Sequence, residues 1–134
     1  MNVKLLRKIQ EHILEEPKRF VMRTFLIRPP DLDDDVFEGD DGTMVKFARC
    51  GTAACVAGWA VLLHDGMDTR VSNLRSRAKS LIGLKKGFNE DLLFEVGGWP
   101  TRFEEAYRSA KTQRGRARVA VRRIDHFIKT KGQE

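Results

Sequence analysis

The clearest chemical feature of the sequence is a run of basic residues near the C-terminus. Between positions 108 and 123 it holds no acidic residue and seven cations, namely Arg108, Lys111, Arg114, Arg116, Arg118, Arg122 and Arg123. A guanidinium group donates two parallel hydrogen bonds to a phosphate. No aromatic residue interleaves with the run, so stacking of nucleobases is not indicated. The run predicts a surface that binds the phosphates of a nucleic acid. The alternatives are a solvated basic face and an arginine set that pairs with the acidic segment 31–41.

A second candidate site is Cys50-Gly51-Thr52, at the expected start of an apolar helix. The free N–H groups and the dipole at a helix start bind anions, and they lower the pKa of a thiol. A nucleotide-binding protein or a thiol enzyme would use this helix start. The competing interpretation is that the Cys50 or Thr52 side chain simply caps the helix.

A cysteine hydrolase also needs a histidine beside its thiol. Only His12, His64 and His126 are available, and none has a catalytic sequence context. His64 would lie about 20 Å from Cys50 along the same helix. The sequence therefore favours a binding protein over an enzyme, and we assign no catalytic residue.

Metal and disulfide sites are not expected. Asp31, Asp33 and Asp35 imitate the first ligand positions of a calcium-binding EF-hand loop, but Val36 and Gly42 stand where that loop needs Gly and Glu. Residues 31–42 therefore predict a solvated acidic loop. Cys50 and Cys55, five residues apart on one helix, would be about 8–9 Å apart, too far for a disulfide. The two thiols do not converge on a zinc ion either, and no cofactor is expected.

The stretch 50–63 must position these groups, because it is the longest uncharged segment of a chain that is 33% charged. A segment that is apolar on every side predicts a helix buried all round, over about 51–63. Its small residues would let neighbouring helices come close: Gly51, Ala53, Ala54, Ala57, Gly58 and Ala60.

The remaining chain predicts a mostly α fold, with five to six helices packed around this central helix. Asn2 starts a helix that ends before Pro17, and the capping box Thr101–Glu104 starts another. Further helices are expected from Asp68 or Thr69 to Gly83, after Asn89, and beyond an interruption at Gly115. The segments 20–27 and 43–48 allow a two-stranded β insert.

Trp99 is a candidate interface anchor. It follows two glycines and precedes Pro100, so a turn there would leave the indole partly exposed. Partly exposed tryptophans are frequent hot spots of protein interfaces.

The central stretch also carries a family resemblance. Cys50–Ala60 has the form CGTxxCxAGWA and resembles a signature of small bacterial and phage-encoded proteins. Similar downstream residues are Leu81-Ile82-Gly83-Leu84, Leu93-Phe94, Trp99-Pro100, Phe103, Tyr107 and Arg123-Ile124-Asp125-His126-Phe127-Ile128. The resemblance implies one intact domain over 1–134 and supplies no catalytic residue.

Composition favours a cytoplasmic protein with a macromolecular partner. The net charge is +6, but residues 1–67 carry −2 and residues 68–134 carry +8. No window reaches the roughly 18 apolar residues of a membrane span. We expect a non-enzymatic binding protein that docks onto another macromolecule, with a protein as first partner and a nucleic acid as the alternative.

Overall fold

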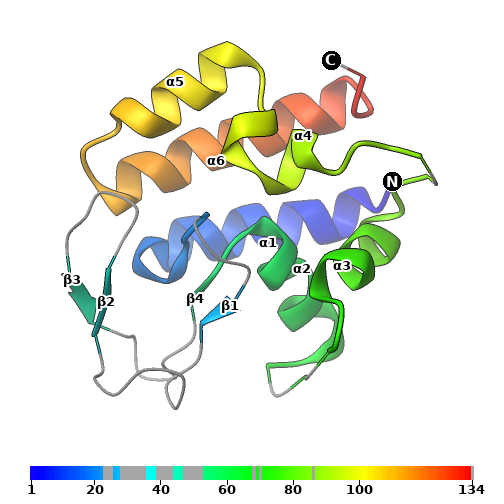
Figure 1. Ribbon diagram of the computed structural model, residues 1–134, viewed down its shortest axis with the longest axis horizontal. Coiled ribbons are helices and arrows are strands. Elements are labelled where there is room, and N and C mark those ends of the chain that lie inside the picture. The colour runs from blue at the N-terminus through cyan, green and yellow to red at the C-terminus, as the bar shows by residue number, and fades with distance from the viewer. Residues whose placement is uncertain are drawn as a thin grey trace.

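The computed structural model is mostly helical, as the sequence predicts (Figure 1). It describes residues 1–22, 26–27, 36–38, 44–46, 53–67, 69, 71–85 and 87–133. In chain order the helices are α1 (Val3–Glu15), η1 (Pro17–Arg19), α2 (Val56–Asp65), α3 (Leu74–Ile82), α4 (Asp91–Phe94), η2 (Val96–Gly98), α5 (Thr101–Ser109) and α6 (Gln113–Lys129). No helix in the described part of the chain combines the length and apolar character needed to cross a bilayer.

Helix α2 is the buried centre, which confirms the prediction of a central helix. Its first seven residues, 56–62, are all buried, and α1, α3 and α4 pack against it. It begins at Val56 and not at Gly51, because Ala53–Ala54 forms the strand β4 and Cys55 is the N-cap. It ends at Asp65, and Gly66 is its C-cap. The φ of Gly66 is 112°, a backbone conformation that glycine adopts readily and that is strained for other residues.

The predicted pairing of segments 20–27 and 43–48 is wrong. Strand β1 (Leu26–Ile27) pairs antiparallel with β4, and β2 (Val36–Glu38) pairs antiparallel with β3 (Met44–Lys46). Strand β2 lies within the segment predicted as an acidic loop, where Val36 and Phe37 favour a strand. Strands β2 and β3 are close in sequence, so their pairing closes a short loop at a low cost in entropy, whereas β1 finds its partner at longer range.

The ends of α1 and α3 show which of the predicted helix caps are present in the structure. Asn2 Oδ1 accepts from the Leu5 N–H at 3.0 Å, and α1 ends before Pro17, as predicted. Helix α3 starts after Asn73, not at 68 or 69, because Asn73 Oδ1 accepts from the Ser76 N–H. Gly83 ends α3 with a φ of 74°, as its position after the apolar pattern predicts.

Two predicted features of the last helices are wrong. Thr101 does not cap α5, because Pro100 is the N-cap and Thr101 is the first helical residue. Gly115 does not interrupt α6, which begins at Gln113 after the N-cap Thr112. Thr112 Oγ1 accepts from the Gly115 N–H at 2.9 Å, so α6 is one helix of 17 residues.

The turn at Gly98 gives a test of this packing. A Cβ added to Gly98 would clash with the main-chain carbonyl of Asp91, whereas one added to Gly97 would meet nothing within 4 Å. We expect Gly98→Ala to lower the free energy of unfolding by about 1 to 3 kcal/mol, and Gly97→Ala to change it far less. Urea unfolding of both variants checks this; equal stability would contradict the described η2 turn.

Candidate functional site

The last helix presents a row of basic side chains to solvent. Arg114, Arg118 and Arg122 are exposed and follow one another at four-residue spacing, so successive Cα atoms lie about 6 Å apart along the helix. Lys111 before the helix and Lys129 in its last turn are also exposed. These five residues are called the α6 basic face. Lys129 was not among the sequence candidates, although its helical position, seven residues after Arg122, places it on the same side.

Four cations of the α6 basic face have no partner of opposite charge. Lys111, Arg114, Arg118 and Arg122 make no ion pair with any residue that the structure describes. The fifth, Lys129, lies 4.0 Å from the Asp125 carboxylate. Among the described residues these four neighbouring cations have no counter-charge, so they are candidates for contact with an external anion.

The one acidic residue of α6 is already engaged. Asp125 Oδ1 accepts from Arg7 of α1 and, at 3.4 Å, from Gln10 Nε2. The hydrogen bond from Arg7 lowers the pKa of the Asp125 carboxyl, so it stays ionised at neutral pH. Its negative charge is balanced mainly by Arg7 and only weakly offsets the α6 basic face.

Two of the predicted surface arginines are buried. Arg123 is 0% exposed and Arg116 is 6% exposed. Arg123 Nη2 donates to the Leu92 carbonyl of α4, and its guanidinium lies 5.4 Å from the centre of the Phe127 ring. Arg116 Nε donates to the Tyr107 carbonyl of α5 at 3.2 Å. Both residues bind carbonyl groups of neighbouring helices, so they stabilise the fold and lie outside the candidate surface.

Their positions explain this outcome. Residues 116, 120, 123 and 127 recur at the spacing of one helix face, and all four are buried. The long apolar stem of an arginine can line a core while its head group donates hydrogen bonds. The helical period therefore identifies 116 and 123 as inward positions, although their charge suggests a surface.

Helix α5 adds Arg102 and Arg108 beside this face. Arg108, a sequence candidate, is exposed and its Nε lies 2.9 Å from Glu104 Oε1, so its charge is shared within α5. Arg102 Nη2 lies 3.0 Å from His126 Nδ1, and its guanidinium covers the Phe103 ring at 4.8 Å. The aromatic side chains of α5 and α6, namely Phe103, Tyr107 and Phe127, are buried or half-buried, so these two helices offer no exposed base-stacking platform.

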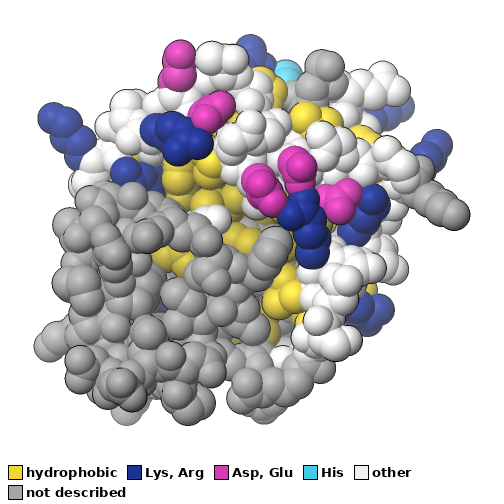
Figure 2. Space-filling view, viewed as in Figure 1, with side chains coloured by type: hydrophobic (Ala, Val, Ile, Leu, Met, Phe, Trp, Pro, Cys, Tyr) yellow, Lys and Arg dark blue, Asp and Glu magenta, His cyan; other side chains and the backbone are white. Residues whose placement is uncertain are grey.

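The basic residues beside α4 are paired with acidic residues. Figure 2 shows acidic side chains gathered around basic ones on the face that carries α4. Arg75 contacts Asp91 and pairs with Glu95 at 2.6 Å, and Lys79 pairs with Glu90 at 2.8 Å. The hydrogen bond from Lys79 is the main cause that lowers the pKa of Glu90 to about 2. Both described cations of this cluster, Arg75 and Lys79, are therefore paired, unlike Arg114, Arg118 and Arg122.

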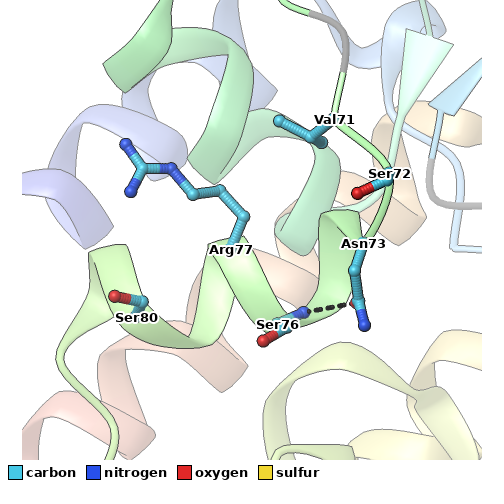
Figure 3. A pocket seen from close by; sticks show the side chains of 6 residues that line it. All are labelled: Val71, Ser72, Asn73, Ser76, Arg77 and Ser80. Atoms are coloured by element: carbon cyan, nitrogen blue, oxygen red, sulfur yellow. Dashed lines mark hydrogen bonds between the residues drawn. The ribbon is translucent and has the colours of Figure 1, made fainter.

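A surface pocket beside α3 offers little chemistry (Figure 3). It is lined by Val71, Ser72, Asn73, Ser76, Arg77 and Ser80. The Arg77 side chain points away from Asn73 and Ser76, and both Nε and Nη2 donate to the Asp65 carboxylate, at 2.8 and 2.7 Å. These hydrogen bonds lower the pKa of Asp65 to about 2. The lining hydroxyls have no base beside them among the residues that line the pocket.

The two remaining candidates fare differently. Trp99 is only 4% exposed, its Nε1 donates to the Leu93 carbonyl at 3.2 Å, and its ring meets Tyr107 edge-on. The prediction of an exposed interface anchor is therefore wrong, because the turn after Gly98 folds the indole into the core. Cys50, Gly51 and Thr52 lie outside the described residues. Cys55 is buried and forms no disulfide.

The contrast between neighbouring arginines is testable. Arg123→Ala removes a buried guanidinium and its hydrogen bond to Leu92, so we expect a loss of about 2 to 4 kcal/mol in the free energy of unfolding. Arg122→Ala, one residue away and exposed, is the matched control, with an expected change within about 0.5 kcal/mol. Thermal and urea unfolding measure both; an unchanged Arg123→Ala protein would show that this arginine is not a core residue.

Comparison with known proteins gives no further identification. No protein-family model, no curated protein and no solved structure matches this chain. The resemblance of its central stretch to small bacterial and phage proteins therefore stays a prediction, and the function has to be inferred from the residues described above.

Proposed function

We propose that this protein is a small non-enzymatic binding protein that docks onto a nucleic acid through the phosphate backbone, with the α6 basic face as its contact surface. The expected setting is the bacterial cytoplasm, for a protein of bacterial or phage origin. A protein partner, the first expectation from the sequence, is the alternative outcome, since Trp99, the predicted interface anchor, is buried.

The observation that carries this proposal is the exposed row of Arg114, Arg118 and Arg122, which form no ion pair with any described residue. Like charges four residues apart on a helix repel, which costs about 0.2 to 0.5 kcal/mol per pair. A phosphate chain would relieve this repulsion and accept the bidentate hydrogen bonds of each guanidinium. The cations of α3 are already paired with carboxylates, so binding an anion would not relieve a similar repulsion there.

The surroundings of α6 favour contact with the backbone over base recognition. Helix α6 lies between α5 and α1 (Figure 1), so it does not project from the surface as a recognition helix does. Arg102 of α5 flanks it and broadens the positive surface, whereas the charge of Arg7 of α1 is balanced by Asp125. Binding by such a surface is electrostatic, and we expect it to depend weakly on sequence and strongly on salt.

The proposal is tested with a fluorescent duplex and the variant Arg114→Gln/Arg118→Gln/Arg122→Gln. Anisotropy titrations between 50 and 200 mM salt give a log–log slope of about −0.9 for each phosphate neutralised. We expect the triple variant to bind all duplexes more weakly and to flatten this slope by about 2 to 3.

The matched control is Lys4→Gln/Lys18→Gln/Lys85→Gln, which changes the net charge equally at exposed positions on other elements. It should retain most of the affinity and the slope. Equal losses in both variants would mean that net charge alone drives binding. If the parent protein shifts neither DNA nor RNA at low salt, the proposal fails, and capture of a protein partner becomes the next experiment.

A variant of the acidic segment 31–41 extends the binding experiment. If it neutralises the arginines internally, Asp33→Asn/Asp34→Asn/Asp35→Asn should create or strengthen binding. If the α6 basic face is already available, this variant should gain little beyond the effect of its added positive charge.

A further inference from the structure

Three side chains form a stack where the end of α1 meets α2. The imidazole of His12 and the indole of Trp59 have ring centres 4.1 Å apart, tilted by 56°. The guanidinium of Arg19, from η1, lies 5.0 Å from the centre of the Trp59 ring. Trp59 is 0% exposed, Arg19 is 8% exposed and His12 is half-buried, so the stack extends from the interior towards the surface. It does not belong to the α6 basic face.

The buried edge of His12 is unsuited to a positive charge. Its Nε2 atom is buried and has no hydrogen-bond partner among the described residues. A neutral imidazole tolerates this arrangement because one of its nitrogens carries no proton. Protonation would place an N–H group at Nε2 with no acceptor, beside the fixed charge of Arg19. Burying a charged donor without an acceptor is unfavourable.

The charges around His12 can be assigned element by element. Burial is the largest influence and lowers the pKa of His12, and Arg19 of η1 lowers it further. Glu16 and Glu15, at the end of its own helix, act in the opposite direction. Helix α2 presents the uncharged Trp59 ring. Helix α6 packs on another side of α1, where Gln10 Nε2 donates to the Val121 carbonyl at 2.8 Å.

We propose that the His12–Trp59–Arg19 stack is a proton-sensitive contact, which holds α1 against α2 while His12 is neutral and loosens when His12 is protonated. The contact lies at a structural junction. Phe20 and Val21, which follow Arg19, meet Ala54 just before α2, and the Val21 N–H donates to the Ala54 carbonyl at 3.2 Å. Loosening the stack would therefore weaken the attachment of η1 and β4 to the core.

The direction of the pH effect follows from linkage. A histidine whose pKa is lower in the folded than in the unfolded chain binds more protons when the chain unfolds. Its contribution to stability is present above the ordinary pKa of about 6.5 and falls as the pH drops below it. In acid, the unfolding equilibrium constant rises by up to tenfold for each unit by which folding lowers the pKa of His12.

The first test is an NMR titration of the histidine ring signals in the intact protein between pH 8 and 4.5. We expect His12 to titrate below the ordinary histidine range. In Arg19→Gln, which removes the neighbouring cation, we expect the His12 midpoint to move upward. A His12 midpoint at or above the ordinary value in the parent protein overturns the proposal, and so does a midpoint that Arg19→Gln leaves unchanged or lowers.

The second test follows unfolding by urea at pH 7.5 and pH 5.5. His12→Phe keeps a ring against Trp59 but cannot be protonated, so its unfolding constant should rise less between the two pH values than that of the parent. His64→Gln, at an exposed histidine, is the matched control and should keep the parent's pH dependence. An equal rise in the parent and in His12→Phe overturns the proposal. If His12→Phe does not fold, the NMR titration of the parent decides.

Discussion

The burial of α2 on every side is the constraint on which the rest of the structure depends. A helix with only apolar and small residues from 56 to 62 cannot face water without exposing a large hydrophobic surface. It must be enclosed, and α1, α3 and α4 supply the enclosure. The small residues Ala57, Gly58 and Ala60 leave room for these neighbours to approach closely. The outer helices are held in place by this requirement.

Helix α6 lies outside the helices that enclose α2. Its inner side packs on α1, α4 and α5, and its other side is left to solvent. The arginines divide accordingly. Arg116 and Arg123 face inward and bind carbonyl groups of α5 and α4, whereas Arg114, Arg118 and Arg122 are exposed and form no ion pair with a described residue. One residue type therefore stabilises the fold from one side of the helix and forms the candidate binding surface on the other.

Much of the fold could be predicted from the sequence because its strongest signals are local. The uncharged central stretch, the cap at Asn2 and the glycine stops at 66 and 83 each depend on neighbouring residues. The predictions that are wrong concern residues whose structure depends on contacts with distant parts of the chain. Ala53–Ala54 is a strand only because β1 pairs with it, and Trp99 is buried because the η2 turn directs it inward. Arg116 and Arg123 belong to the basic run that predicts a surface, but both lie on the buried side of α6, where they contact α5 and α4.

The central claim is that the solvent side of α6 contacts nucleic-acid phosphates, and mapping by NMR tests it most directly. A ¹H–¹⁵N spectrum is recorded as a short DNA duplex is added at low salt, with attention to the side-chain Nε–H signals of the arginines. The account predicts that the signals of Arg114, Arg118 and Arg122 shift together, while Arg75 and Arg77, which pair with carboxylates, and buried Arg123 stay in place. Shifts centred on α3, or no shifts at saturating duplex, would contradict it.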